Sequence, residues 1–405
     1  MNSYLKHYIS IFFISFSLSW LSPAILFGLV GSNFSEPFLF IGFYLLKFTD
    51  KKLFNIISKQ VFSNFILIII LYLFICLLIG LLNFNYSFSN SYADFRAILV
   101  FIITFKIFSN FEWDGSESEK TLIKILVTLT LCDLVALSIR GTVVNNDVEF
   151  IKQVISIPVP VFLVFYFLNR EKFVYTLFFL IILSYEAAFS FLRAYYLIAM
   201  LSFFIYFFVI LYKLITKNNS FRNNIYYIIS IIFPLFSLII LFPKLINYFE
   251  SDEVFTIHSI NRTNEFIDED GSNEIERINS VILVFRELYG FLLPNGLGWR
   301  SSIGYVENYY KDYLILSTMD SSFLFLAFHA SIFFLIFIIF FVFNKSLKNF
   351  IFLLHSKNLS NILLFFLFQS IFLISFFTSA AMFSTPQSAF CYAFIVSTII
   401  YFKKS

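Results

Sequence analysis

Apolar runs separated by short polar breaks follow one another along almost the whole chain. Most runs are roughly 17–25 residues long, the length at which an α-helix crosses the ~30 Å hydrocarbon core of a membrane. A membrane β-barrel is excluded, because its strands alternate apolar and polar residues. The pattern predicts an all-α, polytopic membrane protein with about twelve transmembrane helices. We expect these helices near residues 8–30, 36–48, 60–83, 92–110, 119–139, 150–168, 172–189, 191–213, 223–247, 321–344, 358–380 and 385–402.

Composition supports the assignment to a membrane. Hydrophobic residues make up 60% of the 405 residues and charged residues 13%, which leaves too few polar side chains to cover a soluble globule. The 36–48 segment is short for a full crossing, so it begins nearer Ser32 or is partly re-entrant. Cys76, Cys132 and Cys391 lie in apolar runs without metal-ligand neighbours, so we expect three small core residues.

Lys and Arg are concentrated in every second connection between the predicted helices, at 47–59, 170–172, 213–222 and 345–357, and in the tail at 403–404. Because short cytoplasmic connections carry an excess of these residues, the alternation predicts that both ends of the chain are cytoplasmic. The one long hydrophilic segment then lies outside the cytoplasm. The chain divides accordingly into membrane helices (1–247), a loop (248–320) and further membrane helices (321–405).

The 248–320 loop contains an apolar pattern of its own. Apolar side chains recur at three- and four-residue steps, at Ile275, Ile278, Ile282, Phe285, Tyr289 and Leu292. This spacing predicts an amphipathic helix, capped near Asn273 and ended by Gly290 and Pro294. A loop of this length in a compact protein usually has a function.

Several cations lie near the predicted outer surface. Arg193, in "AFSFLRAYYLIAML", stands at the outer edge of the eighth helix, where insertion of an Arg costs roughly 3 kcal/mol. It either faces a cavity or an anionic partner, or it snorkels toward lipid headgroups. Arg96 and Arg140 lie nearer their loops, so we expect both to snorkel.

The loop adds five further cations, Arg262, Arg277, Arg286, Arg300 and Lys311. The planar fork of arginine suits phosphate and diphosphate oxygens, and fixed cations stabilise the charge that develops on a phosphate leaving group. The alternative is ion pairing with the many Asp and Glu residues of the same loop.

Three side chains are candidates for acid–base chemistry. His258, in the loop, is either a base or simply solvated. Asp320, in "TMDSSFLFLAF", caps the tenth helix, and a carboxylate there can also orient or deprotonate a sugar hydroxyl. His329 lies inside the apolar helix and is either a core histidine or part of a cavity wall.

No phosphate-binding Gly-rich loop with Lys, no Cys/His cluster and no nucleophile elbow occur in the sequence. Asp268 and Asp270 in "DED" are a weak metal signal within an acidic loop, so we predict neither a metal nor a cofactor. Any substrate should therefore arrive already activated, from the lipid side.

These features resemble the O-antigen polymerase (Wzy) and O-antigen ligase superfamily of bacterial inner membranes. Its members have about twelve crossings, cytoplasmic termini and one large periplasmic loop late in the chain. The loop signature is an Arg, a helix and a turn with proline and glycines, followed by an Asp or His that opens the next crossing. It resembles "ERINSVILVFRELYGFLLPNGLGW" and "MDSSFLFLAFHASIFF" here, with Arg277, Pro294, Gly296, Gly298 and Asp320.

"LRAYYLIAML" resembles the Ser-Arg motif of the superfamily, although Leu192 replaces the hydroxyl residue before Arg193. Ligases show a His-Asn-type pair where this chain has Asp320 and Ser321, which favours a polymerase over a ligase.

The resemblance implies a metal-independent glycosyltransferase of a Gram-negative inner membrane. A growing glycan moves from undecaprenyl diphosphate to the non-reducing sugar of a lipid-linked repeat unit, and the diphosphate leaving group supplies the activation. The implied partners are these lipid-linked units, a chain-length regulator (Wzz) and a flippase (Wzx), and no nucleic acid. The implied catalytic residues are Arg193, Arg277, Asp320 and His258, and the implied substrate-binding residues are Arg262, Arg286, Gly296, Gly298 and Arg300.

Within this scheme the two catalytic arginines bind the departing diphosphate, and Asp320 or His258 activates the acceptor hydroxyl. The glycines let the backbone approach the sugar. The rival interpretations are an O-antigen ligase, a lipid-linked oligosaccharide flippase or other transporter, and a non-catalytic scaffold. Flippases usually have short connections and internal pseudo-repeats, and this chain shows neither.

Overall fold

The computed structural model describes residues 3–30, 35–83, 88–111, 113, 115–143, 157–188, 193–216, 292–297, 322–356, 359–378 and 381–398. Among these residues it contains helices and no strand, so the predicted all-α fold is confirmed for this part of the chain. The helices are α1 (Ser3–Leu18), α2 (Leu21–Val30), α3 (Glu36–Thr49), α4 (Lys51–Val61), α5 (Asn64–Asn83), α6 (Phe88–Phe108), α7 (Glu117–Val143), α9 (Pro158–Asn169), α10 (Phe173–Ala188), α11 (Arg193–Thr216), α16 (Ser322–Ala330), α17 (Ile332–Ser356), α18 (Leu359–Thr378), α19 (Ala381–Ser384) and α20 (Pro386–Ser397).

Four of the described helices are long and apolar enough to cross a membrane, at Asn64–Leu82, Ile198–Ile215, Ile332–His355 and Leu359–Phe376. Their surfaces expose large apolar side chains, among them Ile68, Phe204, Phe340 and Phe366. Extended apolar surface of this kind is stable in lipid and costly in water, which identifies a membrane protein. The total of about twelve crossings stays a prediction, and the predicted 223–247 helix lies outside the described residues.

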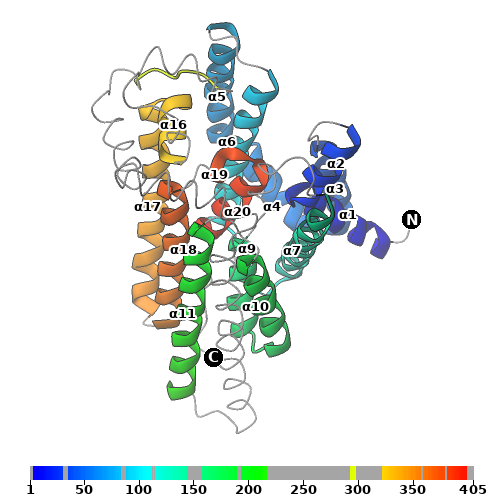
Figure 1. Ribbon diagram of the computed structural model, residues 1–405, viewed down its shortest axis with the longest axis vertical. Helices are drawn as coiled ribbons and strands as arrows, with labels where there is room; N and C mark the ends of the chain where they lie inside the picture. The colour runs from blue at the N-terminus through cyan, green and yellow to red at the C-terminus, as the bar shows by residue number, and fades with distance from the viewer. Residues whose placement is uncertain are drawn as a thin grey trace, which may run out of the picture.

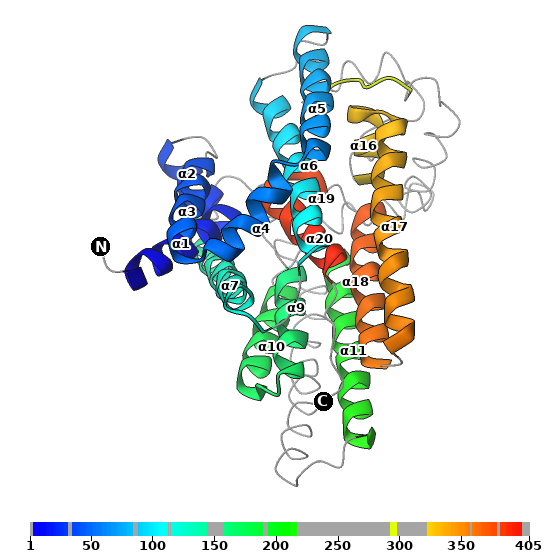
Figure 2. The ribbon, with the colours of Figure 1, turned by 180° about the vertical axis from the view of Figure 1, so that it is seen from behind.

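Helix α20 lies at the centre of the bundle (Figures 1 and 2). Every residue from Pro386 to Ser397 is buried, and the helix packs chiefly against α6. Its start is fixed by Thr385, whose hydroxyl oxygen accepts a hydrogen bond from the Ser388 N–H at 3.2 Å. Helices α17 and α18 run side by side along one flank, and α1, α3 and α7 form the other flank.

Two predicted crossings are interrupted. The 8–30 segment consists of α1 and α2 with a break at Ser19 and Trp20, where Asp133 of α7 accepts a hydrogen bond from the Trp20 N–H at 2.7 Å. The 321–344 segment breaks at Ser331, which has φ +89°, and α17 continues beyond residue 344 to Ser356. Neither break is visible in the hydropathy pattern, because the residues on both sides of each break are apolar.

Polar contacts join several helix ends at one end of the bundle. Ser118 donates to Asp50 Oδ1 at 3.1 Å, Arg170 donates to Glu119 Oε1 at 2.8 Å, and Lys213 donates to Asn169 Oδ1 at 3.0 Å. The connections around 50, 170 and 213 therefore share one end, as expected if all three face the same side of a membrane. That this side is the cytoplasm stays a prediction.

Arg96 corrects one sequence-based interpretation. Instead of snorkelling toward lipid, its guanidinium pairs with the carboxylate of Glu36 at the start of α3 and lies 5.8 Å from the ring centroid of Tyr92. An apolar setting strengthens such a pair, so the two helix ends are bound to each other. The side chain of Arg140 lies outside the described residues.

Candidate functional site

The described piece of the long loop, residues 292–297, is seated among α5, α6 and α16 (Figure 2). The Asn295 N–H donates to the Phe328 carbonyl at 3.1 Å, and the Leu297 N–H donates to the Cys76 carbonyl at 3.1 Å. The Ser91 hydroxyl donates to the Leu297 carbonyl at 2.8 Å. We call residues 294–297 the docked turn, because its backbone is bonded to three helices.

Two independent structural features require glycine at position 296. Its φ of +89° lies in the left-handed region, which costs other residues roughly 1–2 kcal/mol. A Cβ on Gly296 would stand 2.4 Å from both Cα and N of Gly80, and 3.1 Å from the Ile79 carbonyl carbon. Real Cβ atoms do not approach backbone this closely, so the turn can reach α5 only where two glycines face each other.

His329 holds the docked turn from the α16 side. Its Nδ1 lies 2.9 Å from the Gly296 carbonyl oxygen, which can only accept, so Nδ1 carries the proton and donates. The same nitrogen is 3.8 Å from Oδ2 of Asp94 on α6, and both side chains are fully buried. The sequence left two interpretations of His329 open, a core histidine or part of a cavity wall. The structure shows a buried, hydrogen-bonded side chain, as expected for a core histidine.

The His329 ring is further fixed by packing and by the helix break that follows it. The ring of Phe325, one turn earlier on α16, lies 4.3 Å away between centroids. Just beyond, the Tyr72 hydroxyl of α5 donates to the Ala330 carbonyl and lies 3.0 Å from the Ser331 hydroxyl oxygen. Together these contacts satisfy polar groups that the break leaves without helical partners.

The geometry brings one predicted site residue, Gly296, into this cluster. Arg193 is the first residue of α11, and its side chain lies outside the described residues. The other predicted site residues also fall outside them, namely Arg277, Asp320, His258, Arg262, Arg286, Gly298 and Arg300. Their roles stay predictions.

Ser91 and Asp94 were not predicted. Both belong to "NSYADFRAIL", where polar residues continue into the start of an apolar run. An ionisable residue within a transmembrane segment often marks a functional site. Asp94, two residues before Arg96, could have been selected from the sequence on this ground. Nothing in the local sequence indicates that Asp94 meets His329, because 235 positions separate them.

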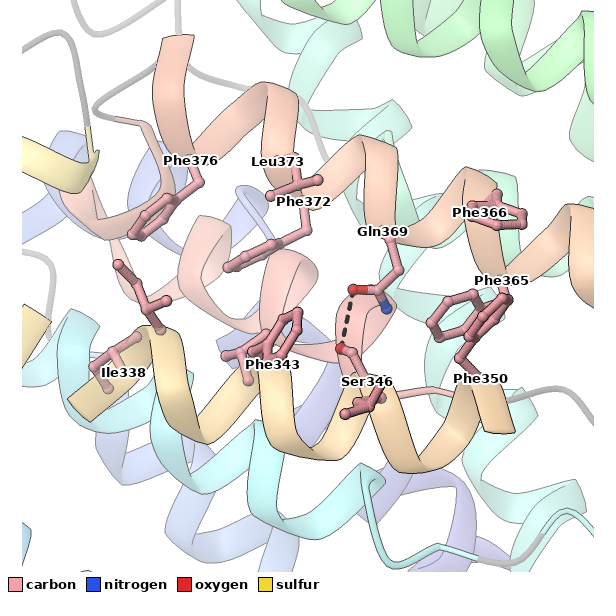
Figure 3. A pocket seen from close by; sticks show the side chains of 13 residues that line it. Ile338, Phe343, Ser346, Phe350, Phe365, Phe366, Gln369, Phe372, Leu373 and Phe376 are labelled. Carbon is pink, nitrogen blue, oxygen red and sulfur yellow. Dashed lines mark hydrogen bonds between the residues drawn. The ribbon is translucent and has the colours of Figure 1, made fainter. Parts of the chain in front are cut away.

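A second feature is an apolar cavity of about 320 Å³ between α17 and α18 (Figure 3). Its walls are mainly aliphatic and aromatic, with Ile338, Phe343, Phe350, Phe365, Phe372 and Phe376 among them. Ser346 donates to Gln369 Oε1 at 3.0 Å inside it. No lining residue is charged, so this cavity suits a hydrocarbon chain and not a diphosphate.

The described residues contain no group of three or more His, Cys, Asp or Glu side chains that could hold a metal ion. The three cysteines are free and buried, as predicted for core residues. Comparison with protein-family models, with curated proteins and with solved structures finds no match to this chain.

Proposed function

We propose that the chain is an O-antigen-type polysaccharide polymerase of a bacterial inner membrane, with about twelve crossings and residues 248–320 in the periplasm. It transfers a growing glycan from undecaprenyl diphosphate to the non-reducing end of a lipid-linked repeat unit. The acceptor hydroxyl oxygen bonds to the anomeric carbon, the bond from that carbon to the phosphate oxygen breaks, and the diphosphate leaves with the electron pair. The hydroxyl proton passes to Asp320 or His258.

The docked turn is the structural observation that supports this proposal. A glycan polymerase must hold the polar groups of its loop at a fixed height above the lipid phosphates, and here the loop is tied into the helix bundle by backbone hydrogen bonds at Asn295 and Leu297. Arg300 follows the anchored Leu297 by three residues in the sequence. Asp320 precedes Ser322, the first residue of α16, by two residues in the sequence.

Helix α16 thus links the two halves of the proposed site. It contacts the docked turn through Phe328 and His329, and Asp320 stands two residues before its start in the sequence. A helix of nine residues is about 13.5 Å long. The proposed base, Asp320, belongs to the segment that enters this helix, and the docked turn contacts the opposite end of the same helix.

In this scheme Arg193 and Arg277 stabilise the negative charge that grows on the leaving diphosphate. Preorganised donors of this kind typically contribute about 10²–10³ in rate each. Arg262, Arg286 and Arg300 hold the remaining phosphate and sugar oxygens, and Gly298 continues the close backbone approach.

A transporter of lipid-linked oligosaccharides is the second candidate. The observation in its favour is a pair of buried acids, Glu186 and Asp133, since intramembrane carboxylates often mark proton relays in transporters. An O-antigen ligase is the nearest alternative within the same superfamily.

The glycan profile of a bacterial strain that lacks the protein separates these functions. A single repeat unit on the lipid core identifies a polymerase. Missing surface glycan with accumulated lipid-linked polymer identifies a ligase and contradicts the proposal. Cytoplasmic accumulation of lipid-linked units identifies a flippase and also contradicts it.

A further inference from the structure

Helix α4 is a short amphipathic helix beside the start of a membrane crossing. Its 11 residues make it about 16.5 Å long, which is too short for the ~30 Å hydrocarbon core. Phe62 and Ser63 alone separate it from α5, whose segment Asn64–Leu82 is long and apolar enough to cross a membrane. Because a crossing begins at the edge of the hydrocarbon layer, α4 lies at the membrane surface.

The apolar face of α4 is turned toward the protein. Leu53 is buried, and Phe54, Ile56 and Ile57 pack against the hydrophobic core. The helix contacts α3 and α6, between the flank that contains α3 and the start of α5 (Figure 2). This face is already covered by protein, so the opposite face is the one that can meet another molecule.

The opposite face of α4 is basic. Lys51, Lys52, Asn55 and Lys59 are all exposed, and their spacing places them on one side of the helix. The helix contains no Asp or Glu. Lys47, in the last turn of α3, adds a fourth exposed lysine. The result is a positively charged surface beside the membrane.

Asp50, which precedes α4, does not neutralise this surface. Its Oδ1 accepts hydrogen bonds from the Leu53 N–H at 2.9 Å and from the Ser118 hydroxyl at 3.1 Å. A carboxylate at this position caps the helix and is stabilised by the helix dipole. Among the described side chains, Lys51 and Lys59 form no ion pair with it or with any other acid. Their charges are therefore available to an anion from outside the protein.

Exposed aromatic side chains stand at both ends of the basic face. Phe48, in the last turn of α3, is 59% exposed, and Phe62, directly after α4, is 85% exposed. Aromatic rings close to lysines are typical of helices that lie in the boundary between lipid headgroups and hydrocarbon. A phospholipid offers phosphate to the lysines and hydrocarbon to the rings, whereas a soluble anion offers only the first. The combination favours a lipid.

We propose that the exposed face of α4 binds anionic glycerophospholipids, with Lys51, Lys52 and Lys59 against the lipid phosphates and Phe62 in the adjoining hydrocarbon. Each lysine close to an anionic membrane surface strengthens the attraction about fivefold. The binding holds the connection between α3 and α5 at the membrane surface. The proposal depends neither on which reaction the protein performs nor on which side of the membrane α4 faces.

The test is native mass spectrometry of the full-length protein, released from detergent that contains equal amounts of phosphatidylglycerol, which is anionic, and phosphatidylcholine, which has no net charge. We expect the wild type to retain more phosphatidylglycerol. A triple variant with Lys51→Gln, Lys52→Gln and Lys59→Gln should reduce this preference at least about tenfold. Arginine at the same three positions keeps the charge and should keep the preference.

The matched control is a triple variant that removes three exposed lysines elsewhere, Lys120→Gln, Lys124→Gln and Lys172→Gln. The net charge falls by the same amount, and we expect the wild-type preference. Phe62→Ser should weaken the retention of phosphatidylglycerol, because the exposed ring loses its contact with hydrocarbon. Glycerol 3-phosphate, a soluble analogue of the headgroup, should not displace the lipid.

Equal retention of the two lipids by the wild type would overturn the proposal, and so would equal losses in the two glutamine triple variants. Loss of the preference in the arginine variant, or wild-type retention in Phe62→Ser, would also contradict it. Displacement of the lipid by glycerol 3-phosphate would mean that the surface binds soluble phosphates, which contradicts it as well. No readout uses glycan synthesis, so failure here leaves the proposed polymerase untouched.

Discussion

Gly296 lies so close to Gly80 that a Cβ added to Gly296 would stand 2.4 Å from the Cα of Gly80. One glycine belongs to the long loop and the other to α5, 216 positions earlier in the chain. Their contact lets the Leu297 N–H reach the carbonyl of Cys76 within α5. At this point the loop packs directly against α5. This close contact is possible only because Gly296 and Gly80 both lack a side chain.

Replacing Gly296 with alanine should release the docked turn. The added Cβ meets backbone atoms that cannot move independently, so we expect a loss of about 1–3 kcal/mol beyond the strain of a positive φ. Gly115→Ala is the matched control, because Gly115 also has a positive φ (+80°), but its nearest neighbour is the Arg170 Nη1 at 3.7 Å. The free energy of unfolding of the two purified variants checks this, and equal losses would contradict the seating of the turn.

His329 offers a second way to loosen the same turn. His329→Phe removes the donor to the Gly296 carbonyl and leaves a buried acceptor unsatisfied, which costs about 1–3 kcal/mol. His329→Asn keeps an N–H donor near the position of Nδ1 and should retain much of the wild-type behaviour. Limited proteolysis of the 248–320 loop measures the effect, with faster cleavage in His329→Phe than in His329→Asn. Equal cleavage in both variants would show that the hydrogen bond does not hold the loop.

Hydropathy predicted the positions of several described helices, because long apolar runs favour helices that cross a membrane. The predicted segments 60–83 and 172–189 correspond to α5 and α10. Breaks within a crossing were missed, because Ser331 lies between residues that suit a continuous apolar helix. Long-range partners were missed for a different reason: the pairing of Arg96 with Glu36 depends on how two helix ends meet, and hydropathy contains no such information.

The candidate site was predictable only in part. Gly296 stood out because a glycine in a loop implies a special backbone, and the structure gives it a positive φ. The sequence left two interpretations of His329 open, because the hydrogen-bond partner of a histidine in an apolar helix depends on how the helices pack. The proposed loop arginines stay predictions that rest on the chemistry of diphosphates.

At the opposite end of the bundle, Glu119 should contribute more to stability than its neighbour Glu117. Buried Glu119 accepts hydrogen bonds from the Tyr166 hydroxyl at 2.6 Å, the Arg170 guanidinium at 2.8 Å and the Gly115 N–H at 2.6 Å. Glu119→Gln removes the charge behind these bonds, and we expect a loss of about 1–3 kcal/mol. Glu117→Gln is the control, because its pair with Lys120 is exposed and should have no measurable effect on unfolding. Similar losses in the two variants would contradict this assignment.

The sidedness of the long loop can be tested by cysteine labelling. The native cysteines at 76, 132 and 391 are free and buried, so they should give little background with a membrane-impermeant thiol reagent. We expect a cysteine introduced at Ser251 or Ser272 to react in intact spheroplasts, and a cysteine at Ser58, on α4, to react only after permeabilisation. The reverse pattern would overturn the topology and the proposed site with it.

The most direct test of the central claim is reconstitution of the purified protein with synthetic undecaprenyl-diphosphate-linked repeat units, in the presence of a metal chelator and without nucleotides. The account predicts a ladder of longer lipid-linked glycans, with one undecaprenyl diphosphate released for each repeat added. Arg277→Ala and Arg193→Ala should lower the rate by about 10²–10³ each. Unchanged repeat units with the wild-type protein, or a full ladder with both arginine variants, would contradict it.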